Sequence, residues 1–568
     1  MTKFFGSNHM ASISKSKLLL GFTSPRTVEK IVPEIKLLTD KFSGQKWERN
    51  PELHKEFFFE LSESDFYEGT KTPNDPGFAG RDRITRAPKA YGFIDLNPTV
   101  KLTEIGHELI TTKRPHEVYL KQMLKFQLPS YYHKDKTNRF NVKPYLELIR
   151  LIDTMKGISK TELSLFFTQL IHHNKFDIIV QKIKDFRSNA KLFKGSRKTY
   201  VDECFNKEVF EIFSDEIKSN NLKRRQSDNE SLKEFLKTKK STMRDYGDAF
   251  MRHIRATQII SFEKRTLRLI ISSSKVKDVD FILNNIDKDI NEFKTEKDFK
   301  DYLFSSTSLQ LFTDNENKLV EKLNELGEQT QIGEYSINIL KDKIDILEKQ
   351  IFETNIENTK QELKTYKEFD DIINIFVQIK NRDVPDAPLF LEWNVWRALV
   401  MINYSKRVDG NFIMDLEGVP LNTAGGGKPD IEAEYNNFGL ITEVTMSGGN
   451  TQFNMEGESV PRHFGDFKKL IGKETYCLFI APKISEGALA HYFNLNRFNT
   501  KSYGGQTKIV PLTIDQFVEF LYTAKNNNFN DSLKLQTWME NICKYNQTCE
   551  DEEEWSLFIN NSIEKWAA

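Results

Sequence analysis

The segment Lys428-Pro429-Asp430 is followed, after an interval of twelve residues, by Glu443-Val444-Thr445. Between the two acids, residues 431–435 alternate apolar and polar side chains, residues 436–439 have the composition of a turn, and residues 440–445 form a second apolar run. This pattern predicts a β-hairpin. A hairpin of this length places Asp430 and Glu443 close together, at the ends of paired strands. Two carboxylates that are held close together at neutral pH repel each other unless a cation lies between them.

This acidic pair suits chemistry on phosphates. Mg²⁺ prefers oxygen ligands and retains water, so two carboxylates and a phosphate oxygen form a natural site for it. Such an ion polarises a phosphoryl group and activates a water molecule. We therefore interpret the hairpin as the active site of a metal-dependent nuclease. The alternative is an ordinary pair of solvated acids at strand ends. The surroundings favour the nuclease, because the flexible Gly425-Gly426-Gly427 precedes the hairpin and the polar residues 446–456 follow it.

Several segments resemble the AlwI-like family of type IIS restriction endonucleases, which includes nicking relatives. The resemblance covers nearly the whole chain from about Ser14 and rests on residues 428–430 and 443–445, Thr451–Glu456, Arg462-His463, Thr23-Ser24-Pro25-Arg26 and Arg81-Asp82-Arg83. It implies a PD-(D/E)xK nuclease domain that uses Mg²⁺, for which Mn²⁺ is expected to substitute. It also implies that the enzyme reads a short asymmetric DNA site of the GAGTC type and cuts a few base pairs away.

The resemblance also assigns roles to individual residues. Asp430 and Glu443 are the expected metal ligands, and Glu392 matches a family acid that helps to hold the metal or its water. Glu456 is a further ligand or a base, unless it merely stabilises the start of a helix. Thr445 stands where the broad pattern has lysine, so His463, Lys428 or a second metal ion is expected to orient the attacking water. A lone histidine such as His463 is otherwise more often structural.

Charge is distributed unevenly along the 568 residues. Residues 1–290 contain 53 Lys and Arg against 38 Asp and Glu, a net charge of +15, whereas the remaining 278 residues carry 29 against 44, a net charge of −15. This split is typical of a DNA-holding module followed by a metal-holding one, although two ordinary solvated surfaces would give the same numbers. We expect a multidomain, mainly α-helical protein with a C-terminal α/β restriction-endonuclease-like domain.

Residues 14–285 form the predicted DNA-recognition region, with winged-helix-like units at about 24–135, 140–220 and 235–285. In the first unit, a short hairpin around Asn97-Pro98 precedes a helix at Glu104–Thr111. In the second, Ser159 and Glu162 form a predicted capping box. The third has a helix at Met243–Arg255 followed by a hairpin. Cations in such units neutralise phosphates or bind base edges, unless they pair with neighbouring acids. The expected DNA contacts are Arg26, Arg81, Arg83, Arg86, Lys89, Arg114, Lys121, Lys125, Arg252 and Arg255.

Residues 286–382 are predicted to be a helical linker, because Ile337, Leu340, Ile344, Leu347 and Ile351 have heptad spacing. Such a helix packs within a hairpin or, less often, as a dimer. We expect its length to set the distance between recognition site and cut.

Residues 383–568 form the predicted nuclease domain. It has helices at Leu389–Ile402, Phe464–Leu470 and Ser485–Phe493, and strands at Asn411–Asp415, in the hairpin, and at Tyr476–Ile480. One acid cluster per chain implies either a nicking enzyme or a partner for the second strand. The expected partners are double-stranded DNA, a transient homodimer through the catalytic domain or a second subunit, and a companion DNA methyltransferase.

Several functional classes are disfavoured. No apolar run reaches the ~20 residues of a membrane span, and the four cysteines contain no CxxC pair that would favour zinc. We expect a cytoplasmic prokaryotic protein. The first dozen residues are left out of the fold prediction. A non-catalytic winged-helix DNA-binding protein and a helical scaffold are the alternative functions.

Overall fold

The computed structural model describes residues 13, 16–25, 27–67, 69, 71–133, 139–223, 230–402, 404–423 and 427–567. The chain divides into two compact units. The first unit contains residues 1–263 and 268–345, and the second contains residues 264–267 and 346–568. Residues 286–345 of the predicted linker thus belong to the first unit, and residues 346–382 to the second. The functional division into reader, linker and nuclease stays a prediction.

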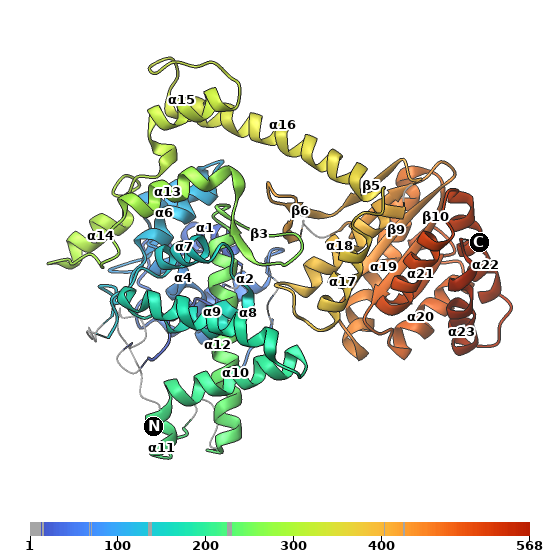
Figure 1. Cartoon of the computed structure of the whole chain (residues 1–568), viewed down its shortest axis with the longest axis horizontal. Helices are drawn as coiled ribbons and strands as arrows, with labels where there is room; N and C mark the ends of the chain where they lie inside the picture. Colours follow the sequence, from blue (N-terminus) through green and yellow to red (C-terminus); the bar gives the residue numbers. More distant parts are fainter. Residues whose placement is uncertain are drawn as a thin grey trace. The chain divides into compact units, whose positions relative to one another are not determined.

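The first unit is mostly helical, with two small hairpins (Figure 1). Its helices are α1 (Ile31–Phe42), α2 (Pro51–Ser62), α3 (Pro76–Thr85), α4 (Ala87–Ala90), α5 (Glu104–Thr111), α6 (Pro115–Lys125), α7 (Pro144–Met155), α8 (Lys160–Leu165), α9 (Phe176–Leu192), α10 (Arg197–Ile212), α11 (Ser214–Lys218), α12 (Leu232–Arg255), α13 (Val276–Asn285), α14 (Glu296–Phe304) and α15 (Glu316–Glu325). The hairpins pair β1 (Ile94–Asp95) with β2 (Lys101–Leu102), and β3 (Ile260–Phe262) with β4 (Leu269–Ile271).

Local signals predicted much of the first unit correctly. The helix expected at Glu104–Thr111 is α5, and the side chain of Thr103 accepts a hydrogen bond from the Gly106 N–H at its start. The capping box predicted for α8 is present, because Ser159 accepts from the Glu162 N–H while the Glu162 carboxylate accepts from the Ser159 N–H. These contacts satisfy N–H groups that a helix start leaves without partners. The assignment of winged-helix units stays a prediction.

The third predicted helix is longer than expected. α12 begins at Leu232, whereas the sequence placed its start at Met243. The added turns come from a strongly charged segment, yet Phe235 is buried there and Ser231 caps the first turn by accepting from the Glu234 N–H. The buried Phe235 and the Ser231 cap help to stabilise the helix through this charged segment.

Helix α16 (Ile337–Leu363) connects the two units along the chain. The helix is where the sequence predicted one, but its heptad positions are not buried along their whole length. Leu340 and Ile344 are buried, whereas Ile337 and Ile351 are 37% and 46% exposed. Only the first turns of α16 therefore have the apolar packing that the heptad pattern predicted.

The second unit contains an α/β arrangement, as the sequence predicted (Figure 1). Its helices are α17 (Phe369–Lys380), α18 (Ala387–Ile402), α19 (Gly449–Ile471), α20 (Glu486–Arg497), α21 (Ile514–Asn526), α22 (Ser532–Asn546) and α23 (Glu552–Ser562). Its strands are β5 (Arg407–Gly410), β6 (Phe412–Met414), β7 (Pro420–Thr423), β8 (Ile431–Glu434), β9 (Phe438–Val444), β10 (Glu474–Ala481) and β11 (Ile509–Thr513).

A mixed five-stranded sheet in the order β11-β10-β9-β8-β5 forms the centre of this unit. β9, β10 and β11 are parallel to one another, while β8 runs antiparallel to both β9 and β5. Ile441 of β9 and Phe479 of β10 pack with Phe464 of α19 and Tyr492 of α20 in one buried cluster. Burial on this scale stabilises the strand that carries Glu443, at about 25 cal/mol per Å² of apolar surface.

Two predicted elements of this unit differ from the structure. The strand expected at Asn411–Asp415 is β6 (Phe412–Met414), and the sequence did not predict β5, which ends just before it at Gly410. The helix expected at Phe464–Leu470 is the second half of α19, which begins at Gly449 and therefore also includes most of the polar residues 446–456.

Pro461 lies inside α19, where proline normally breaks or kinks a helix. A proline cannot donate to the carbonyl four residues earlier, which here belongs to Gly457. The Gly457 carbonyl instead accepts a hydrogen bond of 2.7 Å from His491 Nε2 of α20. A neighbouring helix thus replaces the bond that the proline removes, and α19 continues. Among the described residues, no helix is both long and apolar enough to cross a membrane.

Candidate functional site

The predicted hairpin is present, and it brings the two predicted metal ligands together. β8 and β9 pair with Ile431 opposite Thr442, so the next position in the same register places Asp430 opposite Glu443. The two side chains share a hydrogen bond. The Val444 N–H also donates to Asp430 Oδ2 at 2.8 Å, which fixes the orientation of this carboxyl group. The proximity predicted from the sequence is confirmed, whereas the catalytic role of the pair stays a prediction.

Two further acids face this pair. Glu392 on α18 lies in the electric field of Asp430 and Glu443, and Glu456 on α19 raises the pKa of both members of the pair. Burial raises the pKa of Glu392 to about 9 and that of Glu443 to about 8, and neighbouring carboxylates add to both shifts. Burial also raises the pKa of Asp430 well above its usual range. These four acids need nearby positive charge to be ionised together at neutral pH.

His463 contacts the acid cluster directly. Its Nδ1 lies 2.7 Å from Glu443 Oε1, because α19 packs against the sheet and presents His463 beside the end of β9. Burial lowers the pKa of His463, and the neighbouring Arg462 lowers it further. The other ring nitrogen, Nε2, is buried without a hydrogen-bond partner among the described residues. His463 is therefore placed to orient Glu443 through one nitrogen.

Thr445 occupies the position where the broad nuclease pattern has lysine. Its side chain is engaged by the protein: Oγ1 accepts from the Ser447 N–H at 3.1 Å, and the hydroxyl donates to the Glu456 carboxylate. Thr445 therefore orients Glu456 in this structure. Glu456 lies in the third turn of α19, well past the helix start, so the alternative role of stabilising the helix dipole does not fit its position.

The approach to the hairpin is only partly described. Lys428 is exposed, as expected for a residue that precedes the acid pair. Gly425 and Gly426, which were expected to form a flexible approach, lie outside the described residues, and Gly427 has a φ of +93°, a conformation that favours glycine.

Gln452 has a role that the sequence did not single out. Its side chain is fully buried in the first turn of α19. Nε2 donates to the Ser447 carbonyl at 3.0 Å and to the Lys483 carbonyl at 2.9 Å, while Oε1 accepts from the Ser485 N–H at 2.8 Å. One amide thus joins the segments that follow β9 and β10 and the start of α20. A glutamine in a polar stretch gives no sequence signal for such burial.

The donor set at the hairpin fits a hard divalent cation. Carboxylate oxygens are the ligands that Mg²⁺ prefers, and Asp430 and Glu443 offer them within hydrogen-bonding distance of each other. Within the described parts of the chain, no group of three or more His, Cys, Asp or Glu side chains is already arranged to hold a metal ion. Mg²⁺ usually keeps several waters and takes substrate oxygens as its other ligands.

A model of the AlwI restriction endonuclease family matches residues 90–520, well over half of the chain. The chain belongs to the AlwI restriction endonuclease family. The matched region contains every member of the acid cluster as well as His463 and Gln452. Membership in the AlwI family confirms the resemblance inferred from the sequence, and it supports a hydrolase that cleaves DNA.

Solved structures of other endonucleases are similar to parts of this AlwI-family chain. The small subunit of the heterodimeric restriction endonuclease R.BspD6I is 28% identical, with a TM-score of 0.30, over 34% of this chain and 98% of that one. The BpuJ1 endonuclease binding domain, solved in complex with modified DNA, is 14% identical, with a TM-score of 0.32, over 51% of this chain and 95% of that one. Restriction endonuclease FokI is 11% identical, with a TM-score of 0.23, over 90% of this chain and 97% of that one. No curated protein matches the chain.

The predicted DNA contacts in the first unit of this AlwI-family protein are mostly engaged by protein groups. Arg26 lies outside the described residues. Arg83 Nε donates to the buried Glu34 at 2.6 Å, and Arg86 Nε donates to Asp82 at 2.7 Å, which is the pairing that the sequence offered as the alternative to DNA contact. The Arg81 guanidinium lies over the Phe78 ring, 5.3 Å from its centroid.

Four other predicted contacts are buried: Lys89, Lys121, Lys125 and Arg255. Lys121 Nζ pairs with Asp314 at 2.9 Å, and Lys125 Nζ donates to the Ser305 carbonyl at 2.7 Å. Burial lowers the pKa of Lys89 to about 8 and that of Lys125 to about 7. The expectation that these cations reach DNA phosphates disagrees with their placement, because each lies inside the protein.

The remaining two predicted contacts form ion pairs nearer the surface. Arg114 pairs with Asp342 and with Asp345 Oδ2, the latter at 2.7 Å, and thereby ties the start of α16 to α6. Arg252 Nε pairs with Asp248 at 2.9 Å within α12. Arg252 is thus engaged by an acid four residues away, and Arg114 by acids more than two hundred residues away.

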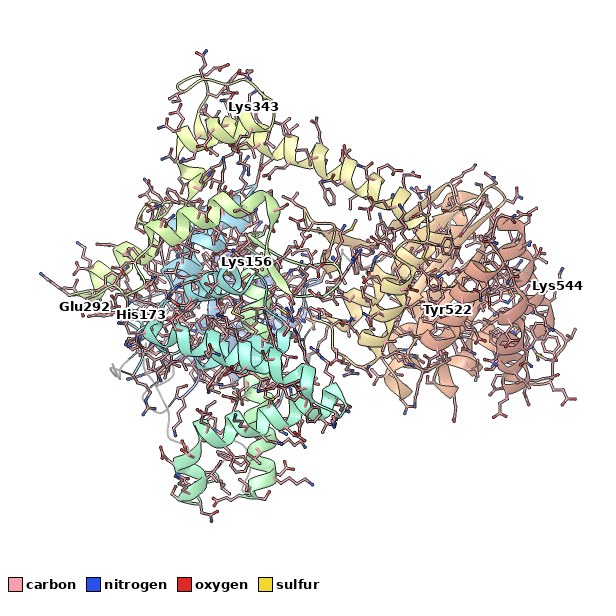
Figure 2. All side chains as sticks on the ribbon, in the orientation of Figure 1. Lys156, His173, Glu292, Lys343, Tyr522 and Lys544 are labelled. Carbon is pink, nitrogen blue, oxygen red and sulfur yellow. The ribbon has the colours of Figure 1, made fainter. Side chains whose placement is uncertain are left out.

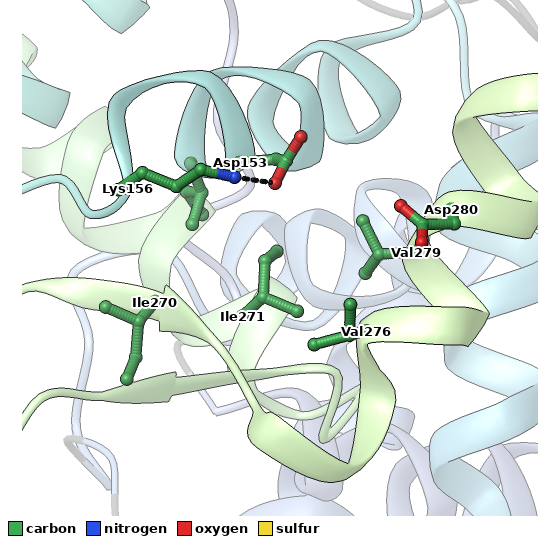
Figure 3. Close-up of a pocket in the computed structure, with 8 residues that line it drawn as sticks. Asp153, Lys156, Ile270, Ile271, Val276, Val279 and Asp280 are labelled. Atoms are coloured by element: carbon green, nitrogen blue, oxygen red, sulfur yellow. Dashed lines mark hydrogen bonds and ion pairs between the residues drawn. The ribbon is translucent and has the colours of Figure 1, made fainter.

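A cavity of about 230 Å³ lies in the first unit beside α7, β4 and α13 (Figure 3). Its apolar lining consists of Ile152, Ile270, Ile271, Val276 and Val279. Lys156, which is also labelled in Figure 2, donates to Asp153 at 2.8 Å on its rim, and Asp280 adds a further charge. The charged residues among the eight that line it are Asp153, Lys156 and Asp280, of which Asp153 and Lys156 pair with each other.

Proposed function

We propose that this member of the AlwI family is a type IIS restriction endonuclease that hydrolyses DNA phosphodiester bonds with the help of a divalent metal ion, Mg²⁺ or Mn²⁺. It reads a short asymmetric duplex site, for which a GAGTC-type sequence is the first candidate, and cuts a few base pairs away. The observation that carries this proposal is the contact between Asp430 and Glu443 on paired strands, in a chain of restriction endonuclease ancestry.

Asp430 and Glu443 hold the metal ion in this proposal, and Glu392 helps to hold it or its water. When bound, a divalent cation supplies Lewis-acid stabilisation of charge on the phosphoryl oxygens and lowers the pKa of water. The residues of the chain provide the orientation. The Val444 N–H fixes Asp430, and His463 holds Glu443 through a 2.7 Å contact.

Glu456 is the proposed proton acceptor or additional ligand. Thr445 donates a hydrogen bond to it and so keeps one carboxylate oxygen directed. Burial raises the pKa of Glu456, and a base with a raised pKa accepts a proton more readily near neutral pH. The hydroxyl of Thr445 carries no positive charge, so it orients Glu456 but does not replace the electrostatic role of a lysine.

A strand-specific nicking enzyme is the second candidate. The candidate site contains one acid cluster per described chain, and one cluster hydrolyses one strand at a time. Cutting both strands therefore requires a second copy of the chain, a second subunit or a second binding event. A companion DNA methyltransferase would protect the host sites of a restriction enzyme.

Cleavage of defined duplexes tests the proposal. Purified protein is incubated with plasmid and with end-labelled duplexes that carry or lack a GAGTC site, in Mg²⁺ or in EDTA, and the cut positions are mapped on both strands. We expect Mg²⁺-dependent cuts at a fixed offset from one asymmetric sequence, with one strand or both cut. Binding without any cut in Mg²⁺ or Mn²⁺ would favour a non-catalytic DNA-binding protein and overturn the proposal.

A further inference from the structure

The turn between α9 and α10 carries an unusual concentration of unpaired positive charge. Lys191, Lys194, Arg197 and Lys198 fall within eight residues, and all of them are exposed. Across the parts of the chain that the structure describes, none of these four side chains forms an ion pair or a hydrogen bond. We call residues 191–198 the basic turn. Figure 1 labels both flanking helices.

Nearby acids do not neutralise the basic turn. Residues 186–201 contain no Asp or Glu. Of the acids that flank this window, Asp202 is paired with Lys240 Nζ at 2.8 Å, and Asp185 accepts from Gln181 Nε2 at 2.8 Å and forms no ion pair with the four cations in the described structure. Four adjacent cations without compensating charge repel one another, and this repulsion is relieved when a polyanion binds.

The backbone of the basic turn is held firmly by aromatic packing. Tyr200 is buried, its hydroxyl donates to the Phe186 carbonyl at 2.8 Å, and its ring stacks on Phe186 with centroids 5.2 Å apart. Phe193 packs on the other side, 5.2 Å from the Tyr200 ring. The cations therefore extend from an ordered turn, and holding them near a polyanion does not require the backbone to be ordered first.

The cations expected from the sequence to bind DNA are mostly buried or paired, so the available positive charge of the first unit lies elsewhere. We infer that the basic turn is an interaction surface for the phosphate backbone of duplex DNA. This inference rests on the proposed function and extends it, because it assigns the contact to a segment of the first unit that carries no sequence motif. Contacts to phosphates fix the position of a protein on DNA without reading the base sequence.

Binding measurements on the full chain test the basic turn. The basic-turn variant carries Lys191→Gln, Lys194→Gln, Arg197→Gln and Lys198→Gln. The control variant carries Lys36→Gln, Lys46→Gln, Lys288→Gln and Lys297→Gln, which removes the same charge from exposed lysines that are dispersed over the first unit. Affinity for a site-bearing duplex is measured in EDTA by fluorescence anisotropy between 50 and about 300 mM salt, a range over which phosphate contacts weaken strongly.

Each lost phosphate contact lowers the slope of log K against log salt by about 0.9. We expect the slope of the basic-turn variant to be smaller by about 2 to 4 and its affinity for the duplex to be at least tenfold lower. The control variant is expected to keep an affinity and a salt slope close to those of wild type. A charge-conserving variant with Lys191→Arg, Lys194→Arg and Lys198→Arg is expected to retain wild-type affinity. Circular dichroism compares the folding of all three variants.

Three outcomes separate the possibilities. If wild type neither binds nor cuts duplex DNA, the proposed function fails. If wild type binds and cuts but the basic-turn variant keeps the affinity and salt slope of the control variant, only the role of the basic turn is overturned. If the basic-turn variant loses affinity for single-stranded RNA but not for duplex DNA, the surface belongs to another polyanion and the inference is likewise overturned.

Discussion

His253 is a buried residue whose protonation state bears on the stability of the first unit. Its Nδ1 lies 2.7 Å from the Tyr91 hydroxyl and 3.2 Å from that of Tyr145, and the two hydroxyl groups are 2.6 Å apart. Burial lowers the pKa of His253 to about 3, from an ordinary value near 6.5. A histidine that stays neutral in the folded protein but gains a proton when unfolded favours unfolding in acid.

The stabilising contribution of neutral His253 is complete above about pH 6.5 and is lost progressively as the pH falls towards 3. We expect the free energy of unfolding of the first unit to fall by about 2 to 3 kcal/mol more between pH 7 and 4.5 in wild type than in His253→Gln. Urea titrations at several pH values measure this difference. His107→Gln, at an exposed position on α5, is the control. Equal pH dependence in wild type and His253→Gln would contradict the assignment.

At the level of single residues, the sequence predicted the proximity of the acid pair but not the burial of the cations. Asp430 and Glu443 were predicted because the hairpin pattern brings two carboxylates together at the ends of paired strands, where they repel each other unless a cation lies between them. Lys125 looked like a DNA contact because it is a lysine in a basic region, yet the Ser305 carbonyl that binds it lies 180 residues away. The partner of Arg83, Glu34, is 49 residues distant. A single sequence does not reveal such distant pairs.

Among the elements, the hairpin of β8 and β9 was predictable because its strands are adjacent in sequence and are joined by a short polar turn. The full length of α19 was not predictable, since the hydrogen bond that compensates for Pro461 comes from His491 on another helix. The partners of Glu443 on α19, His463 and Glu456, depend on that same helix. Local signals therefore predicted that Asp430 and Glu443 lie together, whereas the packing of α19 against the sheet brings His463 and Glu456 to them.

Gln452 joins three of these elements, and we expect it to act as a positioning residue. Gln452→Leu leaves the Ser447 and Lys483 carbonyls and the Ser485 N–H without their partner, at a cost of roughly 1–3 kcal/mol for each buried group that stays unsatisfied. Displacement of the segment after β9 shifts Thr445 and with it Glu456. We expect the single-turnover cleavage rate to fall by about 10- to 100-fold, with little change in DNA affinity.

A second glutamine provides the control for this prediction. Gln516 accepts from the Thr513 N–H in the capping box of α21 and donates to Asn560 Oδ1, and in the described part of the chain no hydrogen bond links it to the acid cluster. Gln516→Leu is expected to lower the melting temperature without reducing the cleavage rate at a temperature where the protein is folded. Equal cleavage rates in wild type and Gln452→Leu would show that Gln452 stabilises the fold only.

Over the whole molecule, the division of charge that the sequence revealed matches two compact units of different composition. The mostly helical first unit contains most of the residues that carry the excess of +15, and the acid cluster lies in the second unit, which has the mixed sheet. The separate DNA-holding and metal-holding roles that this charge split suggested stay a prediction. Composition did not predict which cations are exposed, because ion pairs and burial engage most of those named from the sequence.

The central claim is that Asp430 and Glu443 together hold a metal ion at which DNA is cut. The most direct measurement compares single-turnover cleavage in Mg²⁺ with DNA binding in EDTA for wild type, Asp430→Ala, Glu443→Ala and the control Glu432→Ala, which removes a neighbouring acid of the same hairpin. We expect both site variants to bind the duplex as wild type does and to cut at least about 10²-fold more slowly, while Glu432→Ala cuts normally. Cleavage at the wild-type rate by Asp430→Ala or Glu443→Ala would contradict the account.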